Sequence, residues 1–276
     1  MPELPEVETV VRQLDALIAG RTINQARLLR AKLSPDCSSK RFSSLLQNSS
    51  ITGITRRGKF ILVDLSRGRT LLVHLRMSGR FMLLDEEAAE PKFTHAVFHL
   101  DDETKLVFQD QRHFGLMKIV TSGDLSNLKE LSKLAPEPFS DEFSPDYLRF
   151  CLQRSRRSLK ETLLDQTRVC GLGNIYASEA MFVARADPRM SADSLSAIKT
   201  KRLHSAIRDV LTETVELGKT IAIDRDNIGG NIYGNGSEQI WRVYGRQGEP
   251  CSKCGRPIRR IVQAGRSTFY CAYCQR

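Results

Sequence analysis

The most regular pattern near the N-terminus is a stripe of apolar residues at helical spacing. Its members recur three or four positions apart, and they are Val7, Val10, Val11, Leu14, Leu17 and Ile18. Side chains at this spacing share one face of an α-helix, and a glycine, here Gly20, commonly follows a helix end. Pro5, Glu6 and Glu8 suit a helix N-terminus, because proline fixes φ there and carboxylates favour the positive end of the helix dipole. The chain therefore opens with a predicted amphipathic helix that packs against a core.

From about residue 22 to residue 121 the helical period gives way to short apolar runs. The runs lie at 60–63, 70–73, 80–84, 96–98 and 105–108, and turn-forming pairs such as Arg67-Gly68 and Ser78-Gly79 separate them. Short apolar runs bounded by turns are typical of strands in a β-sandwich or barrel. We predict a β-sandwich domain over residues 1–122 that includes the N-terminal helix.

Proline, serine and glycine punctuate residues 123–143, which we interpret as a linker. Ser144-Pro145 then supplies an N-cap and a first-turn proline. Helical patterns follow at 145–153, 158–169, 174–185 and 194–217, and Gly218 is expected to end the last of them. These patterns predict a helical domain over residues 144–241, so the fold class is α+β with two domains.

The charge of the chain favours a polyanionic partner. Its net charge is +10 and its pI is about 9.4. Residues 242–276 alone hold eight basic side chains against the carboxylate of Glu249. Basic surfaces of this density attract nucleic acid. We predict no transmembrane helix, because no apolar run of about 18 residues occurs, and we recognise no cleavable signal sequence at the N-terminus.

Four of the seven cysteines form a metal-binding pattern. They are spaced Cys251-x2-Cys254-x16-Cys271-x2-Cys274, and paired knuckles of this kind suit tetrahedral Zn²⁺. A four-cysteine set leaves no open position, so we predict one structural zinc in a zinc-ribbon β-hairpin over residues 242–276. A segment this small could not fold by core burial alone. The other three cysteines, Cys37, Cys151 and Cys170, are odd in number, which without a secretion signal indicates a reducing, cytoplasmic setting.

The residue that follows Met1 carries candidate chemistry. We expect Met1 to be removed before a small residue, which makes Pro2 an N-terminal secondary amine. An α-amino group titrates near ~8, so a useful fraction is neutral at physiological pH. Attack by this amine on an aldehyde-like carbon gives an iminium, and the adjacent Glu3 can transfer a proton. The same residues also suit an ordinary helix start, so the opening alone leaves both interpretations open.

The opening Pro2-Glu3-Leu4-Pro5-Glu6-Val7-Glu8-Thr9 resembles that of the formamidopyrimidine-DNA glycosylase family of bacterial base-excision repair enzymes. Further motifs of this family follow in its order: Arg57-Gly58-Lys59, Asp110-Gln111-Arg112-His113-Phe114-Gly115, Gly171-Leu172-Gly173-Asn174-Ile175-Tyr176-Ala177-Ser178-Glu179 and the four C-terminal cysteines. The resemblance covers nearly the whole chain. It implies a bifunctional DNA glycosylase/AP lyase that removes formamidopyrimidines and 8-oxoguanine from double-stranded DNA and cuts the strand by β,δ-elimination.

The resemblance also assigns roles to single residues. Pro2 is then the nucleophile, Glu3 its proton donor, Lys59 a lysine in the lesion pocket and Arg266 the arginine at the hairpin tip that grips the phosphates beside the lesion. The residues that would fill the gap left by a flipped nucleotide are Met77, Arg112 and Phe114. Further implied DNA contacts are His95, Lys160 and Asn174, with Arg156 adding basic charge. Gly171-Leu172-Gly173-Asn174 matches the turn of the family's helix–two-turn–helix motif.

Two segments depart from the family pattern. Phe93 stands where relatives usually carry a histidine, although His95 remains. The double glycine at 229–230 is kept, but the Gly/Asn-rich stretch 227–238 is shorter than the usual loop that closes over an everted 8-oxoguanine, and we expect it to be mobile. Because the catalytic residues are intact and the loop is altered, specificity could extend to ring-opened purines or oxidised pyrimidines.

Two alternatives stay open at the level of the sequence. An endonuclease VIII-type glycosylase for oxidised pyrimidines usually opens Pro-Glu-Gly-Pro, whereas Leu4 favours the purine branch. A non-catalytic protein that binds damaged DNA could keep the zinc finger and the helical turn, but intact Pro2, Glu3 and Lys59 argue against it. We expect a monomer in the bacterial cytoplasm, associated with the nucleoid through DNA.

Overall fold

The computed structural model describes residues 1–230 and 241–276 and divides into two compact units. One unit holds Met1–Ser132 and the segment that begins at Leu217, and the other holds Lys133–Glu216 and the C-terminal residues. Sequence patterns had assigned residues 217–230 to the helical domain. They lie with the first unit because their backbone pairs there: Leu83 N donates to Arg225 O, and Ile228 N donates to Phe81 O.

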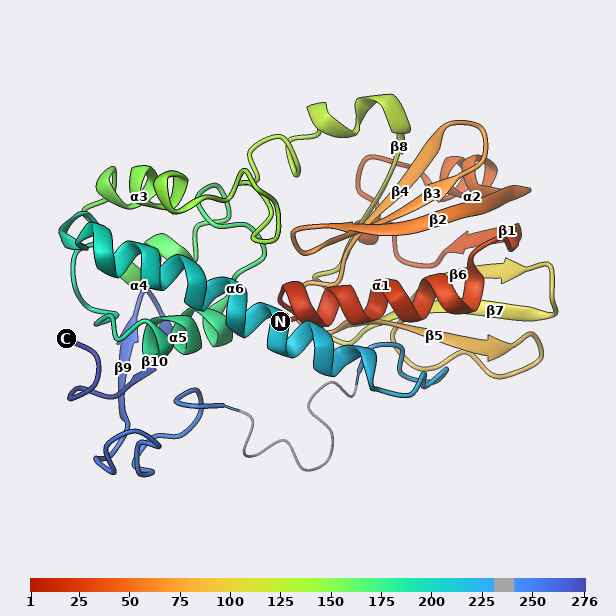
Figure 1. Cartoon of the computed structure of the whole chain (residues 1–276). Coiled ribbons are helices and arrows are strands. Elements are labelled where there is room, and N and C mark those ends of the chain that lie inside the picture. The colour runs from red at the N-terminus through yellow and green to blue at the C-terminus, as the bar shows by residue number, and fades with distance from the viewer. Residues whose placement is uncertain (231–240) are drawn as a thin grey trace. The chain divides into compact units, whose positions relative to one another are not determined.

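The first unit is an antiparallel β-sandwich with one long helix (Figure 1). Its strands are β1 (Thr22–Leu28), β2 (Ser49–Arg57), β3 (Phe60–Leu65), β4 (Arg69–His74), β5 (Gly79–Asp85), β6 (Thr94–Leu100), β7 (Thr104–Asp110) and β8 (Leu116–Thr121). They follow the order β5-β7-β6-β1-β2-β3-β4-β8. A short pairing of β1 with β2, at Thr22↔Ser50 and Ile23↔Ser49, joins the two four-stranded halves.

Helix α1 (Leu4–Ile18) covers strands β2 and β3 and contributes one wall of the core. The predicted apolar face is buried, with Val7, Leu14 and Ile18 each at most 1% exposed. Three shorter elements also belong to the unit: the helix α2 (Ser39–Leu46) and the 3-10 turns η1 (Ala31–Leu33) and η2 (Ser122–Asn127). The predicted sandwich and its N-terminal helix are therefore confirmed.

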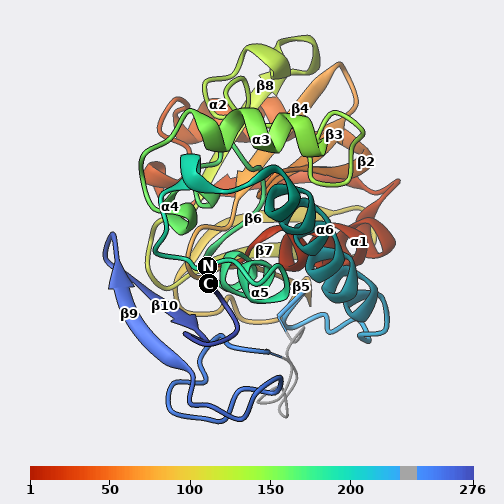
Figure 2. The same ribbon diagram turned by 60° about the vertical axis from the view of Figure 1, so that its left-hand side comes forward.

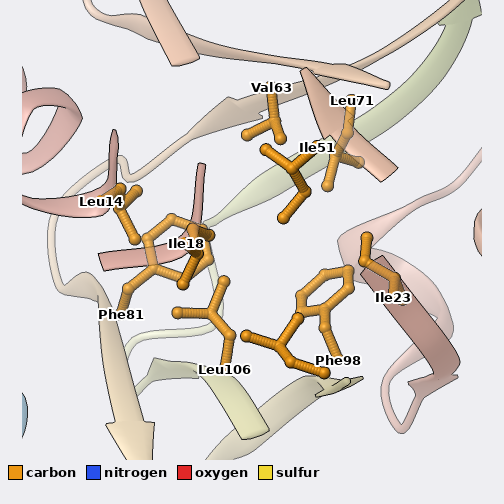
Figure 3. Close-up of a pocket in the computed structure, with 10 residues that line it drawn as sticks. Leu14, Ile18, Ile23, Ile51, Val63, Leu71, Phe81, Phe98 and Leu106 are labelled. Atoms are coloured by element: carbon orange, nitrogen blue, oxygen red, sulfur yellow. The ribbon is translucent and has the colours of Figure 1, made fainter. Parts of the chain in front are cut away.

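The interior of the sandwich is apolar and contains a small void (Figure 3). The void measures about 20 Å³, and its lining comes from α1 and seven strands: Leu14, Ile18, Ile23, Ile51, Val63, Leu71, Phe81, Phe98, Leu100 and Leu106. A space with only apolar walls stays dry, because a water molecule would find no hydrogen-bond partner there.

The second unit combines four helices with a two-stranded hairpin. The helices are α3 (Pro145–Gln153), α4 (Leu159–Leu163), α5 (Asn174–Val183) and α6 (Ala197–Lys219), with a 3-10 turn η3 at Ala192–Ser194. Strands β9 (Arg259–Gln263) and β10 (Arg266–Tyr270) form the hairpin beside α5 (Figure 2). None of the helices in the described residues has the length and apolar composition needed to cross a membrane.

Two predicted helix ends differ from the structure. Helix α4 ends at Leu163 rather than near 169, because the Asp165 carboxylate accepts hydrogen bonds from the backbone and hydroxyl of Thr167 and forms a local turn. Helix α6 continues past Gly218 to Lys219. Gly218 lets the helix backbone come close to Thr9 instead, since a Cβ atom at this position would lie 2.3 Å from Thr9 Oγ1.

Candidate active site and metal centre

The N-terminal residues begin a firmly capped helix. Glu3 is the N-cap of α1 and is only 3% exposed, and its backbone N–H donates to Glu6 Oε2 over 2.6 Å. Glu3 and Glu6 form a reciprocal capping box, and Pro5 lies in the first turn. Pro2 therefore immediately precedes a helix whose first turn is fixed, and the buried face of the helix anchors that turn to the sandwich.

Lys59 lies on a two-residue turn between β2 and β3. The pair Arg57↔Phe60 closes the turn, so Gly58 and Lys59 are its two central residues. Gly58 has a φ of 59°, which glycine adopts without strain at the first central position of a hairpin turn. The Lys59 side chain is 6% exposed, so the turn presents a largely buried lysine.

His74 borders the same turn, because Phe60 pairs with it across β3 and β4. Its Nδ1 accepts a hydrogen bond from Arg76 N over 2.9 Å, and its ring packs edge-on against Phe60. Burial, with help from the charges of Arg76 and Lys59, lowers the pKa of His74 to about 3. The imidazole is therefore neutral at physiological pH and adds no positive charge beside Lys59.

The carboxylate of Asp110 organises the turn that carries Arg112 and Phe114. It is fully buried and accepts hydrogen bonds from Gly115 N over 2.7 Å, from Arg112 N over 3.2 Å and from Ser78 Oγ. Burial acts to raise the pKa of Asp110, but these hydrogen bonds outweigh it and hold the pKa below its usual value. Because Ser78 follows Met77, the same carboxylate ties the Met77 loop to this turn.

The three residues predicted to fill a gap in DNA are exposed or border solvent. Met77 is 43% exposed and Phe114 is 55% exposed, which is unusual for large apolar side chains. The Arg112 guanidinium lies 5.2 Å from the centre of the Phe114 ring. The Asp110 carboxylate thus connects the loops that carry these residues, and their contacts with DNA stay predictions.

His95 is packed within the protein. It is 3% exposed, and its Nε2 lies 2.9 Å from Nδ1 of His113, with the two rings stacked. Phe93, which replaces the usual histidine, packs its ring against His113. Burial lowers the pKa of His95, opposed by the Asp110 carboxylate and reinforced by His113 and Arg30. The predicted contact of His95 with DNA stays a prediction.

In the second unit, two predicted phosphate ligands hold the hairpin. Lys160 is fully buried, and its Nζ donates to Ser267 O over 2.7 Å and to Thr268 Oγ1 over 2.8 Å. Asn174, the first residue of α5, donates from Nδ2 to the same Ser267 carbonyl. The Asn174 Oδ1 atom is buried and finds no hydrogen-bond partner among residues 1–230 and 241–276. Both side chains thus fix the residue next to Arg266, and their contact with phosphate stays a prediction.

Arg266 itself is exposed at the hairpin turn, and Arg156 is exposed before α4. Arg266 pairs with Gln263, and the two residues between them, Ala264 and Gly265, both have positive φ. A two-residue turn of this kind makes a tight hairpin tip. The fold therefore presents the Arg266 guanidinium to solvent on a braced strand.

The four C-terminal cysteines converge on a common centre. Their sulfur atoms all lie within 4.8 Å of one another, with Cys251 and Cys274 4.0 Å apart and Cys254 and Cys271 3.5 Å apart. Tetrahedral zinc with Zn–S bonds of ~2.3 Å separates its ligands by about 3.8 Å. Backbone N–H groups of Lys253 and Cys274 point at Cys251 Sγ and Cys271 Sγ, which suits negatively charged thiolates. This donor set fits one structural zinc.

Comparison with known proteins identifies the family. Residues 1–117 match the formamidopyrimidine-DNA glycosylase N-terminal domain, and residues 134–226 match the H2TH domain of the same enzymes. Residues 248–276 match the zinc finger found in FPG and IleRS. A formamidopyrimidine-DNA glycosylase of Pelotomaculum thermopropionicum is 40% identical over 279 residues, which cover 100% of this chain and 99% of that protein. The chain belongs to the formamidopyrimidine-DNA glycosylase family.

Other members of the formamidopyrimidine-DNA glycosylase family agree. The enzyme of Halalkalibacterium halodurans is 43% identical over 282 residues, with both chains fully covered. The structure of Lactococcus lactis Fpg (MutM) in complex with DNA containing N7-benzyl-Fapy-dG superimposes with a TM-score of 0.91 at 32% identity, covering 99% of each chain. Membership makes this chain a DNA glycosylase/AP lyase of base-excision repair with one structural zinc, as its sequence predicted.

One buried structural residue was not singled out from the sequence, although it ends a family motif. Glu179 is fully buried in α5, and its carboxylate accepts hydrogen bonds from the backbone N–H groups of Arg242, Val243 and Tyr244 over 2.8–2.9 Å. It therefore anchors the start of the zinc-finger segment. A lone carboxylate within an otherwise uncharged helix was the available signal, because a buried charge requires such partners.

The structure describes the first residues of the Gly/Asn-rich stretch that departs from the family pattern. Ile228 is 1% exposed and bridges to Phe81, and Gly229 N donates to Gln13 Oε1 over 2.8 Å. A side chain at Gly229 would collide with Val10, whose Cγ2 lies 2.2 Å from the position of a Cβ atom. The predicted mobile stretch runs from 227 to 238, and its residues 231–238 lie outside the described residues.

Proposed function

We propose that this glycosylase acts through an iminium formed by Pro2. The Pro2 nitrogen attacks C1′ of the damaged nucleotide, the C1′–base bond breaks, and the base leaves with its electron pair and takes up a proton. Glu3 protonates the ring oxygen as the sugar opens. The resulting iminium acidifies C2′, and successive β- and δ-elimination expels the 3′ and 5′ phosphates. Lys59 and Arg266 assist these eliminations.

The observation that carries this proposal is the capped start of α1. A nucleophile needs fixed geometry, and misplacement by ~1 Å can cost a factor of about 10² in rate. Pro2 directly precedes Glu3, whose carboxylate and backbone belong to a capping box, and Glu3 is 3% exposed. A buried carboxylate next to the amine is suited to proton transfer in a site from which water is largely excluded.

The proposed DNA contacts divide into gap-filling and phosphate-binding groups. Met77, Arg112 and Phe114 replace the flipped nucleotide, and the shared anchor at Asp110 supports their acting together. The phosphate-binding group comprises His95, Arg156, Lys160 and Asn174. Lys160 and Asn174 are already bonded to the hairpin, so we propose that they contact phosphate by exchanging or sharing these partners.

The proposed substrates are oxidised purines, with formamidopyrimidines and 8-oxoguanine foremost. Leu4 and the full-length identity to formamidopyrimidine-DNA glycosylases support the purine branch. Lactococcus lactis Fpg has also been crystallised with DNA containing an oxidised pyrimidine. This favours, as a second activity, excision of oxidised pyrimidines by the same site.

We also propose a monomer that works on double-stranded DNA in the bacterial cytoplasm. The domain limits 1–122, 144–241 and 242–276, joined by a linker at 123–143, remain part of this proposal as limits of family domains, although residues 217–230 lie with the first compact unit. The separate matches of residues 1–117, 134–226 and 248–276 to three domain families support a division of this kind.

Borohydride trapping tests the proposal. Untagged protein, with Met1 removal checked by mass spectrometry, is incubated with duplex DNA that carries 8-oxoguanine opposite cytosine or an abasic site. We expect a covalent adduct that maps to Pro2 on both substrates and none with Pro2→Gly. An adduct on the abasic site alone would remove the 8-oxoguanine assignment, and strand cleavage retained by Pro2→Gly would contradict the mechanism.

A further inference from the structure

Arg56 joins the helix that carries the N-terminus to the turn that carries Lys59. Its Nε donates to Glu8 Oε2 on α1 over 3.0 Å, and its Nη1 donates to the carbonyl oxygen of Gly58 over 3.0 Å. The Glu8 carboxylate also accepts from Arg12 Nε on the next turn of α1, again over 3.0 Å. One guanidinium thus bonds at the same time to α1 and to the β2–β3 turn.

The atom that Arg56 contacts on the turn controls the direction of Lys59. The Gly58 carbonyl belongs to the peptide unit that links Gly58 to Lys59, and a peptide unit is rigid and planar. Fixing its oxygen therefore fixes the orientation of that plane, from which the Cα–Cβ bond of Lys59 departs. The restraint is useful at this place, since glycine lets the turn adopt more than one backbone conformation.

Burial separates this interaction from an ordinary surface ion pair. The Arg56 side chain is 9% exposed and that of Glu8 is 22% exposed, whereas Arg12 on the other side of Glu8 is 39% exposed. Exposed pairs contribute little because water screens them, but a planar guanidinium held away from solvent imposes geometry on both of its partners. Of these two ion pairs, the one between Arg56 and Glu8 is therefore better suited to hold the β2–β3 turn in a fixed position relative to α1.

We propose that Arg56 and Glu8 are positioning residues for catalysis, which align the Lys59 ammonium with the amine and carboxylate at the start of α1. The inference rests on the proposed role of Lys59. Neither Arg56 nor Glu8 contacts the reacting atoms in this arrangement. Their effect on the reaction passes through the orientation of the Gly58–Lys59 peptide.

A double-mutant cycle between Arg56 and Lys59 tests the proposal. The single-turnover rate of strand cleavage at an abasic site is measured for the full chain, its variants Arg56→Ala and Lys59→Ala, and the double variant. Affinity is measured separately on DNA with a tetrahydrofuran abasic analogue. We expect Arg56→Ala to lower the rate about 10²-fold, as for misplacement by ~1 Å, and to change Kd less than about twofold. Arg12→Gln, which removes the other partner of Glu8, should stay within about twofold of the parent rate.

The cycle separates positioning from a general structural effect. If Arg56 acts through Lys59, the double variant should be no slower than Lys59→Ala alone, because coupled residues are not additive. A further loss of about 10²-fold in the double variant would overturn the inference and leave the proposed function intact. A Lys59→Ala variant with the parent rate would overturn both the inference and the proposed role of Lys59. If Arg56→Ala proves unfolded by circular dichroism, Arg56→Lys replaces it in the same cycle, since an ammonium cannot reproduce the two-partner geometry of the guanidinium.

Discussion

At the scale of single residues, burial decides the charge of His74 and thereby a part of the acid stability. Its pKa is about 3 in the folded chain and ~6.5 when exposed, so the unfolded chain binds more protons between these values. The stability that the folded chain has with a neutral His74 is fully present above pH ~6.5. It declines as the pH falls below this value, and it is lost below pH ~3. At 1.36 kcal/mol for each pH unit, His74 alone should lower the free energy of unfolding by about 2 kcal/mol as the pH falls from 7.5 to 5.

The variant His74→Gln measures this contribution. Its free energy of unfolding is compared with that of the parent in urea at pH 7.5 and pH 5. We expect the drop between the two pH values to be smaller by about 2 kcal/mol in the variant. An equal drop in both proteins would mean that the buried imidazole is already protonated at pH 5.

Residue identities were readable from the sequence where a motif or a metal spacing constrained them. The four cysteines were found in this way, and the proposed roles of Pro2 and Glu3 come from a motif, because their chemistry depends on residue type and spacing. The partners of Lys160 and the role of Glu179 were not readable. Each depends on a contact across about a hundred or about sixty positions of the chain, which local patterns do not encode.

At the scale of elements, the β9–β10 hairpin depends on zinc. Its apolar cluster is small, with Phe182, Val243, Ile258 and Phe269 as its buried members besides two cysteines. Binding of a structural zinc supplies an apparent ~10–16 kcal/mol to folding of such domains. We expect zinc removal by a chelator, or Cys254→Ser, to expose the amides of 259–270 to hydrogen exchange and to lower strand cleavage at least about 10²-fold.

The rest of the molecule supplies the control for this prediction. Strands β2–β4 should keep their amide protection after zinc removal, because they lie in the other compact unit. Cys37→Ser, which alters a half-buried thiol of that unit, should leave zinc content and cleavage unchanged. Persistent protection of β9 and β10 without zinc would show that the hairpin folds on its own core.

The sandwich core offers a second prediction at this scale, through the void in Figure 3. Val63 lines it from β3 and is 6% exposed. Val63→Ile adds one methylene group to a space of about 20 Å³, and we expect it to stabilise the chain by about 0.5–1 kcal/mol. Val63→Ala should instead cost about 2 kcal/mol, because it enlarges the void. Urea unfolding checks both variants, and a destabilised Val63→Ile would mean that the core is already fully packed.

Element prediction succeeded where burial was one-sided or complete. The apolar face of α1 and the runs within β3, β4, β5, β6 and β7 were recognised from their periodicity. Strand β1, with the sequence Thr-Ile-Asn-Gln-Ala-Arg-Leu, gave no such signal, since its burial does not alternate strictly. The continuation of α6 past Gly218, where the backbone comes close to Thr9, gave no such signal either.

At the scale of the whole molecule, the sandwich class followed from the sequence and the strand order did not. Strand β1 pairs with β6 across about seventy positions, and the segment from Leu217 returns to bridge Phe81 on β5. Nothing local specifies these pairings, because apolar strands of similar length can pair in many orders. The net charge, by contrast, is a property of the sequence alone, and it leads to a test of how the molecule binds DNA.

Affinity for DNA should fall steeply with salt, and the slope should report individual phosphate contacts. Arg156, Lys160 and Arg266 are the three cationic residues proposed to bind phosphate, so a plot of log Kd against log salt should have a slope of magnitude about 3. Arg266→Ala should reduce this slope by about 1, since Arg266 is exposed at the hairpin tip. Arg27→Gln removes an equal formal charge from a side chain paired with Glu90 and should leave the slope unchanged.

Met77→Ala should also keep the slope while it slows excision, because an apolar wedge releases no counterions. Titration of duplex DNA carrying a tetrahydrofuran abasic analogue between 50 and 200 mM salt measures all four proteins. If Arg266→Ala kept the parent slope, the hairpin arginine would hold no phosphate. If Arg266→Ala and Arg27→Gln reduced the slope equally, only the net charge of the molecule would matter.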